Sequence, residues 1–343
     1  MVAPTLYARG YLFCCATRDT TAGARGALTP HFGAELNHYL LSLLLGIIEG
    51  LTEFLPVSST AHLRLSEAFL GVDLSSGYWK MYSIVIQLGA ILCLPIYFRQ
   101  RIRDFVASFP RGREGKHTVM THPLSLTAVA FVFTALPSLL LTKVIGKNLE
   151  SVHVMAWSLL IGGVIMWVVD AIYGPPRPLP ARSVGAAASA STPTLGYRTE
   201  QVEQMTLGQA IWIGICQIFS AVFPGTSRSM ATIAAGQVAG MSRPAALEFS
   251  FFLSIPTMVA ATGYDLFHSF HHKPGAADIG VAPHTSQEWI VLAIGFLVSF
   301  VVAYAVVAWF MNWVRKRGFV PFAVYRIVLA VLVFAWAART AAH

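Results

Sequence analysis

Residues 46–63 read GIIEGLTEFLPVSSTAHL, an apolar stretch that Pro56 interrupts near its middle. Proline removes a backbone donor and clashes with the preceding helical turn, so a helix that enters this stretch ends near Pro56. Such a break is tolerated at membrane depth only where it faces protein or a water-filled cavity. The surrounding segment 38–70 therefore predicts two half-helices within a membrane protein, with polar residues gathered at the break.

A second apolar segment, residues 206–240, is broken in the same way by Pro224-Gly225. A shift of 168 residues relates the two segments; it places Gly46 on Gly214, Glu49 on Gln217, Pro56 on Pro224 and Ser59 on Ser227. Proline-interrupted apolar segments at corresponding positions of two halves point to a binding site near the bilayer midplane. We therefore expect two re-entrant helical hairpins in inverted-topology repeats.

The composition excludes a water-soluble protein. Of the 343 residues, 55% are hydrophobic and 12% are charged, and the mean hydropathy is +0.62. A helix needs about 20 apolar residues to cross a bilayer. Six windows meet this requirement, namely 78–98, 124–143, 152–173, 245–268, 288–314 and 321–341. We expect an all-α polytopic membrane protein with six transmembrane helices and a single membrane domain over 36–343.

The net charge of +8 indicates cytoplasmic loops of a membrane protein rather than a nucleic-acid binding surface. The basic residues form short clusters beside apolar spans, not one stripe with interleaved aromatics. These clusters follow the first, third and fifth spans, at Arg99 to Lys116, Arg177 to Arg198 and Arg315 to Arg317. Because short loops rich in Lys and Arg stay in the cytoplasm, the first hairpin and its site are predicted to open to the outer face.

Three further segments complete the organisation. Residues 1–35 lack the charged start, apolar core and cleavage site of a signal peptide, so we expect a poorly ordered extension. Residues 174–205 are rich in Pro, Ala and Ser, which predicts a cytoplasmic linker between repeat one (38–173) and repeat two (206–341). The small residues Gly236 and Gly240 suit either helix packing within the chain or a homodimer contact.

Two acidic residues stand out in the first broken segment. Glu49 and Glu53 are four residues apart, so both carboxylates project from one helix face. An intramembrane carboxylate is costly unless it faces a cavity, a cation or a partner. The pair is thus a candidate site for a divalent cation, Mg²⁺ or Ca²⁺; the alternative is a helix end at headgroup level with both groups solvated.

Hydroxyl groups follow each break, where a helix N-terminus favours anions. The candidate phosphate-binding residues are Ser58, Ser59, Thr60, Thr226, Ser227, Arg228 and Ser229. Hydroxyls at a helix start are also ordinary caps. Arg228 adds a permanent charge that binds phosphate oxygens bidentately, unless it snorkels to the headgroups. Arg243 and Arg326, near the ends of spans, are interpreted as interfacial anchors.

The candidate nucleophile and base lie one helical turn apart. His62 follows Ser59 by three residues, so its imidazole is predicted to approach the Ser59 hydroxyl. With the acid pair and Arg228, these groups fit phosphoryl transfer, in which catalysis comes mainly from positioning and electrostatic stabilisation. A flippase or transporter of a lipid phosphate would use the same residues and remains the alternative; a purely structural membrane protein would not need them.

Four segments carry a family resemblance. They read GIIEGLTEFLPVSSTAHL (46–63), PGTSRSMATI (224–233), SRPAALEFSFFLSIP (242–256) and PFAVYRIVLA (321–330), and they resemble the bacterial undecaprenyl-diphosphate phosphatase family of bacitracin-resistance proteins. The resemblance implies hydrolysis of undecaprenyl diphosphate in the bacterial plasma membrane, assisted by a divalent cation, which recycles the lipid carrier for peptidoglycan synthesis. It also implies six spans with two re-entrant hairpins.

The resemblance assigns roles by motif. Glu49 and Glu53 match the family's acidic pair, Ser59 and His62 its nucleophile and base candidates, and Arg228 its phosphate-binding arginine. Either Ser59 attacks with help from His62, or His62 attacks or activates water directly.

The chain departs from the family pattern at two positions. Ala61 and Met230 stand where the family usually has glycine. Met230 is therefore expected to place a bulky side chain in the phosphate turn.

Overall fold

The computed structural model describes residues 37–72, 77–112, 115, 117–141, 144–145, 151–174, 198–270 and 283–341. The extension predicted over 1–35 and most of the predicted linker, residues 175–197, lie outside these ranges.

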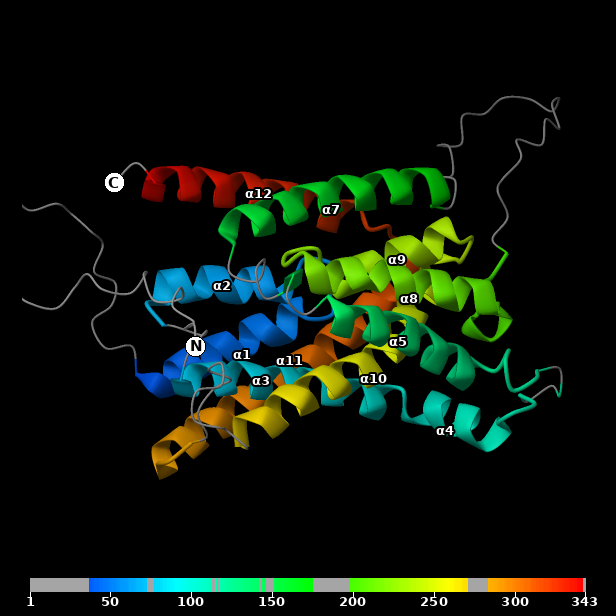
Figure 1. The fold of residues 1–343 in the computed structure, drawn as a ribbon, viewed down its shortest axis with the longest axis horizontal. Helices are drawn as coiled ribbons and strands as arrows, with labels where there is room; N and C mark the ends of the chain where they lie inside the picture. Colours follow the sequence, from blue (N-terminus) through cyan, green and yellow to red (C-terminus); the bar gives the residue numbers. More distant parts are fainter. Residues whose placement is uncertain are drawn as a thin grey trace, which may run out of the picture. The chain divides into compact units, whose positions relative to one another are not determined.

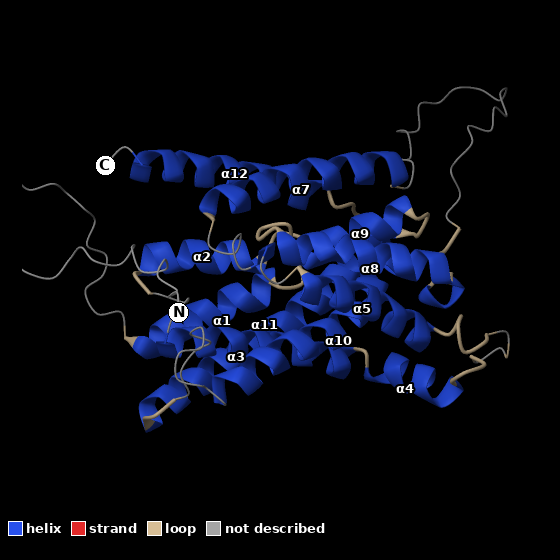
Figure 2. Ribbon diagram, in the orientation of Figure 1, coloured by secondary structure: helices blue, strands red, loops and turns tan. Residues whose placement is uncertain are grey.

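The described residues form a fold of helices, and Figure 2 draws no strand among them. The elements are α1 (His38–Thr52), α2 (Ser59–Leu70), α3 (Gly77–Tyr97), α4 (Arg99–Ser108), α5 (Pro123–Leu140), α7 (Val152–Tyr173), η1 (Val202–Gln204), α8 (Leu207–Val222), α9 (Arg228–Val238), α10 (Arg243–Phe270), α11 (Ser286–Lys316) and α12 (Val320–Ala341). Six of them, α3, α5, α7, α10, α11 and α12, are long and apolar enough to cross a membrane, which confirms the six predicted windows.

Both predicted breaks are present. Residues 53–58, here called the first loop, separate α1 from α2, and residues 223–227, the second loop, separate α8 from α9. Each loop ends on a serine in the left-handed region, with φ of 77° at Ser58 and 68° at Ser227, and each serine caps the following helix. Non-glycine residues adopt this conformation rarely, so both loops are strained at the same structural position.

The matching serines change the correspondence between the two broken segments by one residue. Ser58 and Ser227 are 169 residues apart, one more than the shift that relates the two prolines. The second loop therefore contains one additional residue after its proline. Beyond the loops, Ser59 corresponds to Arg228 rather than to Ser227.

Helix packing holds α1 tightly against α11. A Cβ at Gly46 would lie 2.9 Å from the carbonyl oxygen of Gly295, and a Cβ at Gly50 2.8 Å from that of Ser299. The two glycines thus allow the backbones to approach closely. In Figure 1, α7 and α12 lie side by side, and α2 and α9 extend to opposite sides of the two loops.

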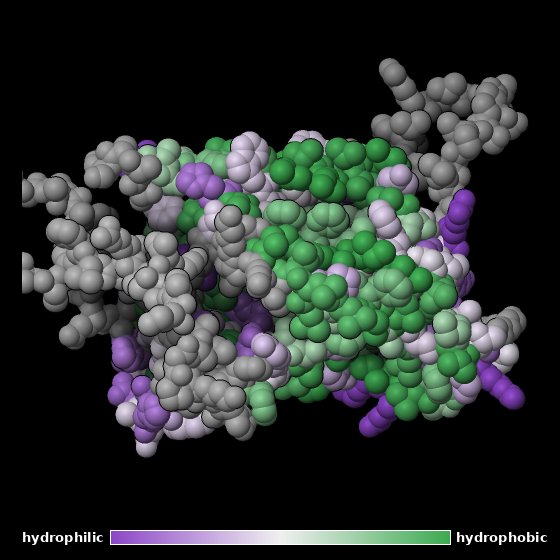
Figure 3. Space-filling model, viewed as in Figure 1, coloured by the Kyte–Doolittle hydropathy of each residue, from purple (hydrophilic) through white to green (hydrophobic). Residues whose placement is uncertain are grey.

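Apolar side chains fill the core and cover the outside of the helices. Buried aromatic residues such as Phe54, Phe251 and Phe310 form the centre of the main core cluster. Figure 3 shows apolar residues over the middle of the visible face and hydrophilic residues toward the helix ends. This distribution suits a helical protein surrounded by lipid.

Two details differ from the predictions. The final part of the predicted linker is packed, because Thr199 bridges to Met241 and Val202 is fully buried. Arg243 is not an interfacial anchor: its Nε donates to the buried carboxylate of Asp170 at 2.7 Å.

One of the two predicted small residues packs within the chain. A Cβ at Gly236 of α9 would lie 2.9 Å from the Cβ of Ala246 on α10, whereas a Cβ at Gly240, beyond the end of α9, would meet only the Arg198 side chain at 3.6 Å or more.

Candidate functional site

The first turn of α9, directly after the second loop, forms hydrogen bonds to the first loop. Arg228, the first residue of α9, donates from Nη2 to Glu53 Oε1 at 3.1 Å, across 175 positions of sequence. Its neighbour Ser229 donates to the carbonyl oxygen of Leu55 at 3.1 Å. The predicted convergence of an arginine from one half on the acidic pair of the other is therefore what the structure shows.

Glu53 joins this arginine to the candidate nucleophile. Its second oxygen, Oε2, accepts a hydrogen bond of 2.6 Å from the Ser59 hydroxyl. Both residues are buried, and hydrogen bonds to an ionised acceptor are shorter and stronger than neutral ones. The serine oxygen is thus oriented by a carboxylate that could accept its proton.

His62 makes different contacts from those predicted. Its Nδ1 lies 2.7 Å from the carbonyl oxygen of Ser58, and its Nε2 lies 2.6 Å from the hydroxyl of Tyr325. The imidazole folds back over the first turn of α2, four residues beyond Ser58, instead of toward the Ser59 side chain. Both ring nitrogens are engaged, and the Ser59 hydroxyl has Glu53 as its partner.

Glu49 and Arg228 carry buried polar atoms with no protein partner. They are both carboxylate oxygens of Glu49 and the Nε and Nη1 atoms of Arg228. A buried polar group without a partner is costly, so such atoms mark a place where a ligand or ion completes the structure. Glu53 and Arg228 are the charged groups that act on the Glu49 carboxyl, which places all three in one site.

These atoms fit a divalent cation bound together with a phosphate ligand. Glu49 offers two free oxygens, and each Glu53 oxygen keeps a second lone pair beyond the bond it already accepts. Within the described residues no group of three or more His, Cys, Asp or Glu side chains could hold a metal. Mg²⁺ is often held by one or two carboxylates, with substrate phosphates supplying the remaining ligands.

The hydroxyls predicted to bind phosphate divide into two groups. Ser58 and Ser227 are occupied as N-caps, accepting from the third residue of the following helix at 3.4 Å in each case. Ser229 Oγ is 3.0 Å from Ser227 Oγ and bridges to the first loop. Among the described residues, no hydrogen bond involves the side-chain hydroxyl of Thr60 or Thr226, so both hydroxyls can donate to a ligand.

Arg326 is a site residue that sequence reasoning placed wrongly. This fully buried guanidinium of α12 donates to the carbonyl oxygens of Pro56 at 3.3 Å, Gly225 at 2.9 Å and Ser158 at 3.1 Å. It therefore ties the first loop, the second loop and α7 together and is not an interfacial anchor. The signal was available in principle, because an arginine within an apolar span is a functional candidate.

Comparison with known proteins agrees with this geometry. A family model described as bacitracin resistance protein BacA matches residues 42–332. The chain belongs to this family.

Three BacA-family relatives, each named undecaprenyl-diphosphatase, show how far the similarity extends. The protein of Koribacter versatilis strain Ellin345 is 61% identical over 305 residues, which cover 89% of this chain and 100% of the relative. That of Rhizobium etli strain CIAT 652 is 38% identical over 302 residues, or 87% and 97% of the two chains. That of Caldanaerobacter subterraneus subsp. tengcongensis is 34% identical over 291 residues, or 85% and 93%.

Both departures from the BacA-family pattern are buried residues. Met230 is 3% exposed and belongs to the main core cluster. A Cβ at Gly162 of α7 would meet both Met230 Cε and the Arg326 guanidinium, so the Met230 side chain ends near the arginine that binds the second loop. Ala61 is fully buried in a small cluster with Ala156 and Ala330.

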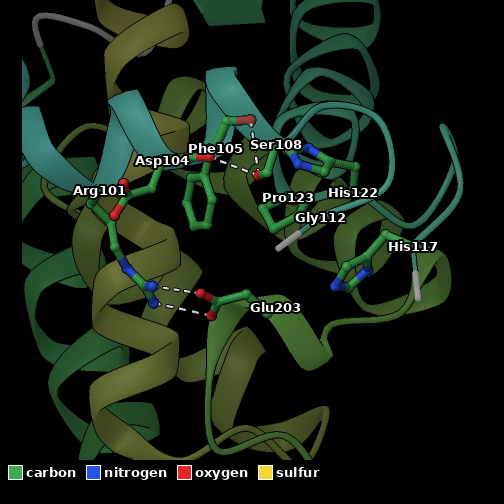
Figure 4. A pocket seen from close by; sticks show the side chains of 9 residues that line it. All are labelled: Arg101, Asp104, Phe105, Ser108, Gly112, His117, His122, Pro123 and Glu203. Atoms are coloured by element: carbon green, nitrogen blue, oxygen red, sulfur yellow. Dashed lines mark hydrogen bonds and ion pairs between the residues drawn. The ribbon is translucent and has the colours of Figure 1, made fainter. Parts of the chain in front are cut away.

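A separate cavity of about 80 Å³ lies between α4, the start of α5 and η1. Figure 4 shows the imidazoles of His117 and His122 on one side of it and the ion pair of Arg101 with Glu203 on the other. The nine residues that line it include no candidate site residue, so this cavity is distinct from the loop site.

Proposed function

We propose that this chain hydrolyses undecaprenyl diphosphate to undecaprenyl phosphate and inorganic phosphate. This reaction would recycle the lipid carrier for peptidoglycan synthesis and confer bacitracin resistance. The observation that carries the proposal is the Ser59, Glu53 and Arg228 chain of hydrogen bonds across the two loops. Relatives named undecaprenyl-diphosphatase support the substrate and the reaction.

Ser59 is the nucleophile that the geometry favours. Glu53 takes the hydroxyl proton through the 2.6 Å hydrogen bond, while Oγ forms a bond to the terminal phosphorus. The bridging P–O bond breaks, undecaprenyl phosphate leaves, and the proton on Glu53 passes to a phosphate oxygen. Water then cleaves the phosphoserine: its oxygen joins the phosphorus, and one of its protons restores the serine hydroxyl.

Arg228 is suited to neutralise the phosphoryl oxygens. Its Nη2 is held by Glu53, which leaves Nε and Nη1 as buried donors without a protein partner, available to phosphate oxygens. The free hydroxyls of Thr60 and Thr226 supply further donors. Such preorganised donors stabilise charge that develops in the transition state.

Glu49 and Glu53 would hold a divalent cation, Mg²⁺ or Ca²⁺. When bound, such an ion neutralises diphosphate oxygens and acts as a Lewis acid. The two unpartnered oxygens of Glu49 support this assignment.

The placement of the site in the membrane is also part of the proposal. The helices α1, α2, α8 and α9 have 15, 12, 16 and 11 residues, too short to span a bilayer singly. Their pairing through strained serine caps supports two re-entrant hairpins in inverted repeats. Basic loops after α3, α7 and α11 support a plasma-membrane protein whose site opens to the outer face.

A lipid flippase is the second candidate function. Paired broken helices related as inverted repeats are typical of alternating-access transporters. A flippase would move undecaprenyl phosphate without releasing inorganic phosphate, so the two functions give different products.

The deciding experiment uses the full chain, purified in detergent, with undecaprenyl diphosphate and Mg²⁺ or Ca²⁺. Phosphate release, abolished by a chelator and by Ser59→Ala, is the expected result. Ser83→Ala is the matched control, because the Ser83 hydroxyl bonds only locally to Lys80 on α3. Full activity of Ser59→Ala would remove Ser59 as nucleophile; no phosphate release but lipid transfer in vesicles would favour the flippase.

A further inference from the structure

Tyr325 of α12 meets the imidazole of His62 across 263 positions of sequence. Its hydroxyl lies 2.6 Å from Nε2, and the two rings are parallel to within 6° at a centroid distance of 5.6 Å. It directly precedes Arg326, so two adjacent residues of one span reach the loop region. Although 45% of Tyr325 is exposed, its hydroxyl end is committed to His62.

The two hydrogen bonds of His62 define its tautomer. The carbonyl oxygen of Ser58 only accepts, so the Nδ1 atom at 2.7 Å carries the proton and donates. In the neutral ring Nε2 then carries the lone pair and accepts from the tyrosine hydroxyl. The opposite tautomer would direct the Nδ1 lone pair at a carbonyl oxygen, which is unfavourable.

This tautomer supports a strained residue beside the nucleophile. Ser58 has a φ of 77°, a conformation that is unfavourable for a non-glycine residue and persists only where its surroundings enforce it. The Nδ1–H of His62 holds the carbonyl of this residue, which is part of the peptide bond to Ser59. The imidazole therefore helps to fix the backbone from which the nucleophile projects.

The second loop has the backbone bond but not the imidazole. The carbonyl oxygens of Ser58 and Ser227 each accept from the backbone N–H four residues later, at 3.3 Å from His62 and 3.1 Å from Ala231. Ser227 has the matching strained conformation, but the alanine side chain offers no second donor to its carbonyl. Of the two helices that follow the loops, only α2, which carries the candidate nucleophile Ser59, has a histidine at this position. The difference links the histidine and its tyrosine partner to the reaction rather than to loop folding in general.

We propose that Tyr325 is a positioning residue, which fixes the tautomer of His62 and through it the backbone at Ser58 and Ser59. The inference rests on the proposed phosphatase function for its kinetic consequence. The tautomer itself is a property of the protein without substrate, so it can be measured independently.

The kinetic test replaces the hydroxyl alone. Tyr325→Phe keeps the ring, and in the full detergent-purified chain kcat for phosphate release is expected to fall about tenfold, with KM within about twofold. In a His62→Ala background the same substitution is expected to add no further loss, because Tyr325 acts through that ring. Tyr304→Phe is the control: this tyrosine of α11 is 37% exposed and contacts Tyr97.

The spectroscopic test needs no activity. In ¹⁵N-histidine-labelled protein, with the His62 signals assigned by their loss in His62→Ala, the parent is expected to show Nδ1 protonated and Nε2 unprotonated and hydrogen-bonded. Tyr325→Phe is expected to shift the Nε2 signal and admit the second tautomer; Tyr304→Phe is not.

Several results would overturn the positioning role. They are a parent spectrum with Nε2 protonated in the neutral ring, an unchanged kcat in Tyr325→Phe, or an undiminished loss from Tyr325→Phe in the His62→Ala background. A parent chain that releases no phosphate would instead overturn the proposed function, while the spectra still decide the tautomer.

Discussion

The guanidinium of Arg326 donates a hydrogen bond of 2.9 Å to the carbonyl oxygen of Gly225, at the centre of the second loop. The same side chain reaches Pro56 in the first loop and Ser158 on α7. A planar fork with several fixed donors is what allows one residue to serve three separate segments. The two halves of the site are thus held in register by a residue from the last span.

Arg326→Lys tests this role. A lysine keeps the charge but not the fork, so we expect it to lose at least one charge-assisted hydrogen bond, each worth ~1.5–3 kcal/mol. Thermal unfolding in detergent is expected to occur at a lower temperature, and phosphate release to fall more than about tenfold as the loops separate. Arg339→Lys, exposed on the same helix, is the control and should change neither. If Arg326→Lys and Arg339→Lys have the same unfolding temperature and the same phosphate release, Arg326 does not hold the two loops together.

Gly162 of α7 makes room for this arginine, which gives a second prediction. A Cβ there would collide with Nη2 of Arg326 and lie 2.7 Å from Cε of Met230. Gly162→Ala is expected to lower the free energy of unfolding by about 1–3 kcal/mol through overpacking, and with it the unfolding temperature. Gly263→Ala in α10, where a Cβ meets nothing within 4 Å, should be neutral or stabilising because alanine favours the helix. A stable Gly162→Ala protein with full activity would contradict the tight fit.

Features set by neighbouring residues were predicted from the sequence, whereas contacts between distant segments were mostly missed. Hydropathy predicts the spans, and proline predicts the breaks, because both act through neighbouring residues. The meeting of Arg228 with Glu53 was predictable from the matching proline breaks of the two segments. The contacts of His62 with Tyr325 and of Arg326 with the two loops join segments more than 100 residues apart, so no local pattern specifies them, although an arginine within an apolar span already marks a candidate.

The acidic pair predicts a metal dependence that differs between its members. Glu49 has two unpartnered oxygens, whereas both oxygens of Glu53 already accept protein hydrogen bonds. Glu49→Gln is therefore expected to raise the Mg²⁺ or Ca²⁺ concentration for half-maximal phosphate release by at least about tenfold, ~1.4 kcal/mol of binding. Glu53→Gln should raise that concentration less, because both Glu53 oxygens are shared with protein donors, and should lower kcat even at saturating metal. Titrations of chelator-treated protein measure both, and a matching metal response of the two variants would refute the division of roles.

His122 predicts a pH dependence of stability at the separate cavity. Its Nδ1 accepts from the backbone N–H of Leu124 at the start of α5, and burial, with His117 as the lesser cause, lowers the pKa of His122. The folded protein then binds fewer protons there than the unfolded chain, whose histidine titrates near ~6.5. This contribution is complete above that pH and is lost as the pH falls through the lowered value.

Asparagine at this position removes the titration and keeps the cap. Asn is a favoured N-cap, so His122→Asn is expected to flatten the fall in unfolding temperature between about pH 7.5 and 5.5. Asp104, Arg101 and Glu203 line the same cavity and are unchanged in this variant. His153→Asn, exposed on α7, should keep the parent slope. A parent unfolding temperature that rises on acidification would contradict the assigned direction.

The buried carboxylate of Asp170 joins α7 to two other segments, away from the two loops. It accepts from Nε of Arg243 at 2.7 Å and from the backbone N–H of Phe319 at 2.9 Å, so it joins α7 and α10 to the turn before α12.

Removing one partner of a buried ion pair leaves the charge of the other partner uncompensated. Asp170→Asn is expected to destabilise the protein by about 3 kcal/mol, and Asp170→Asn with Arg243→Gln by less than the sum of the single changes. Glu200→Gln, an exposed neutralisation, should cost little. Because the pair lies outside the loop site, phosphate release per folded molecule should persist in Asp170→Asn, and a selective loss of kcat without loss of stability would show that this contact acts on the reaction instead.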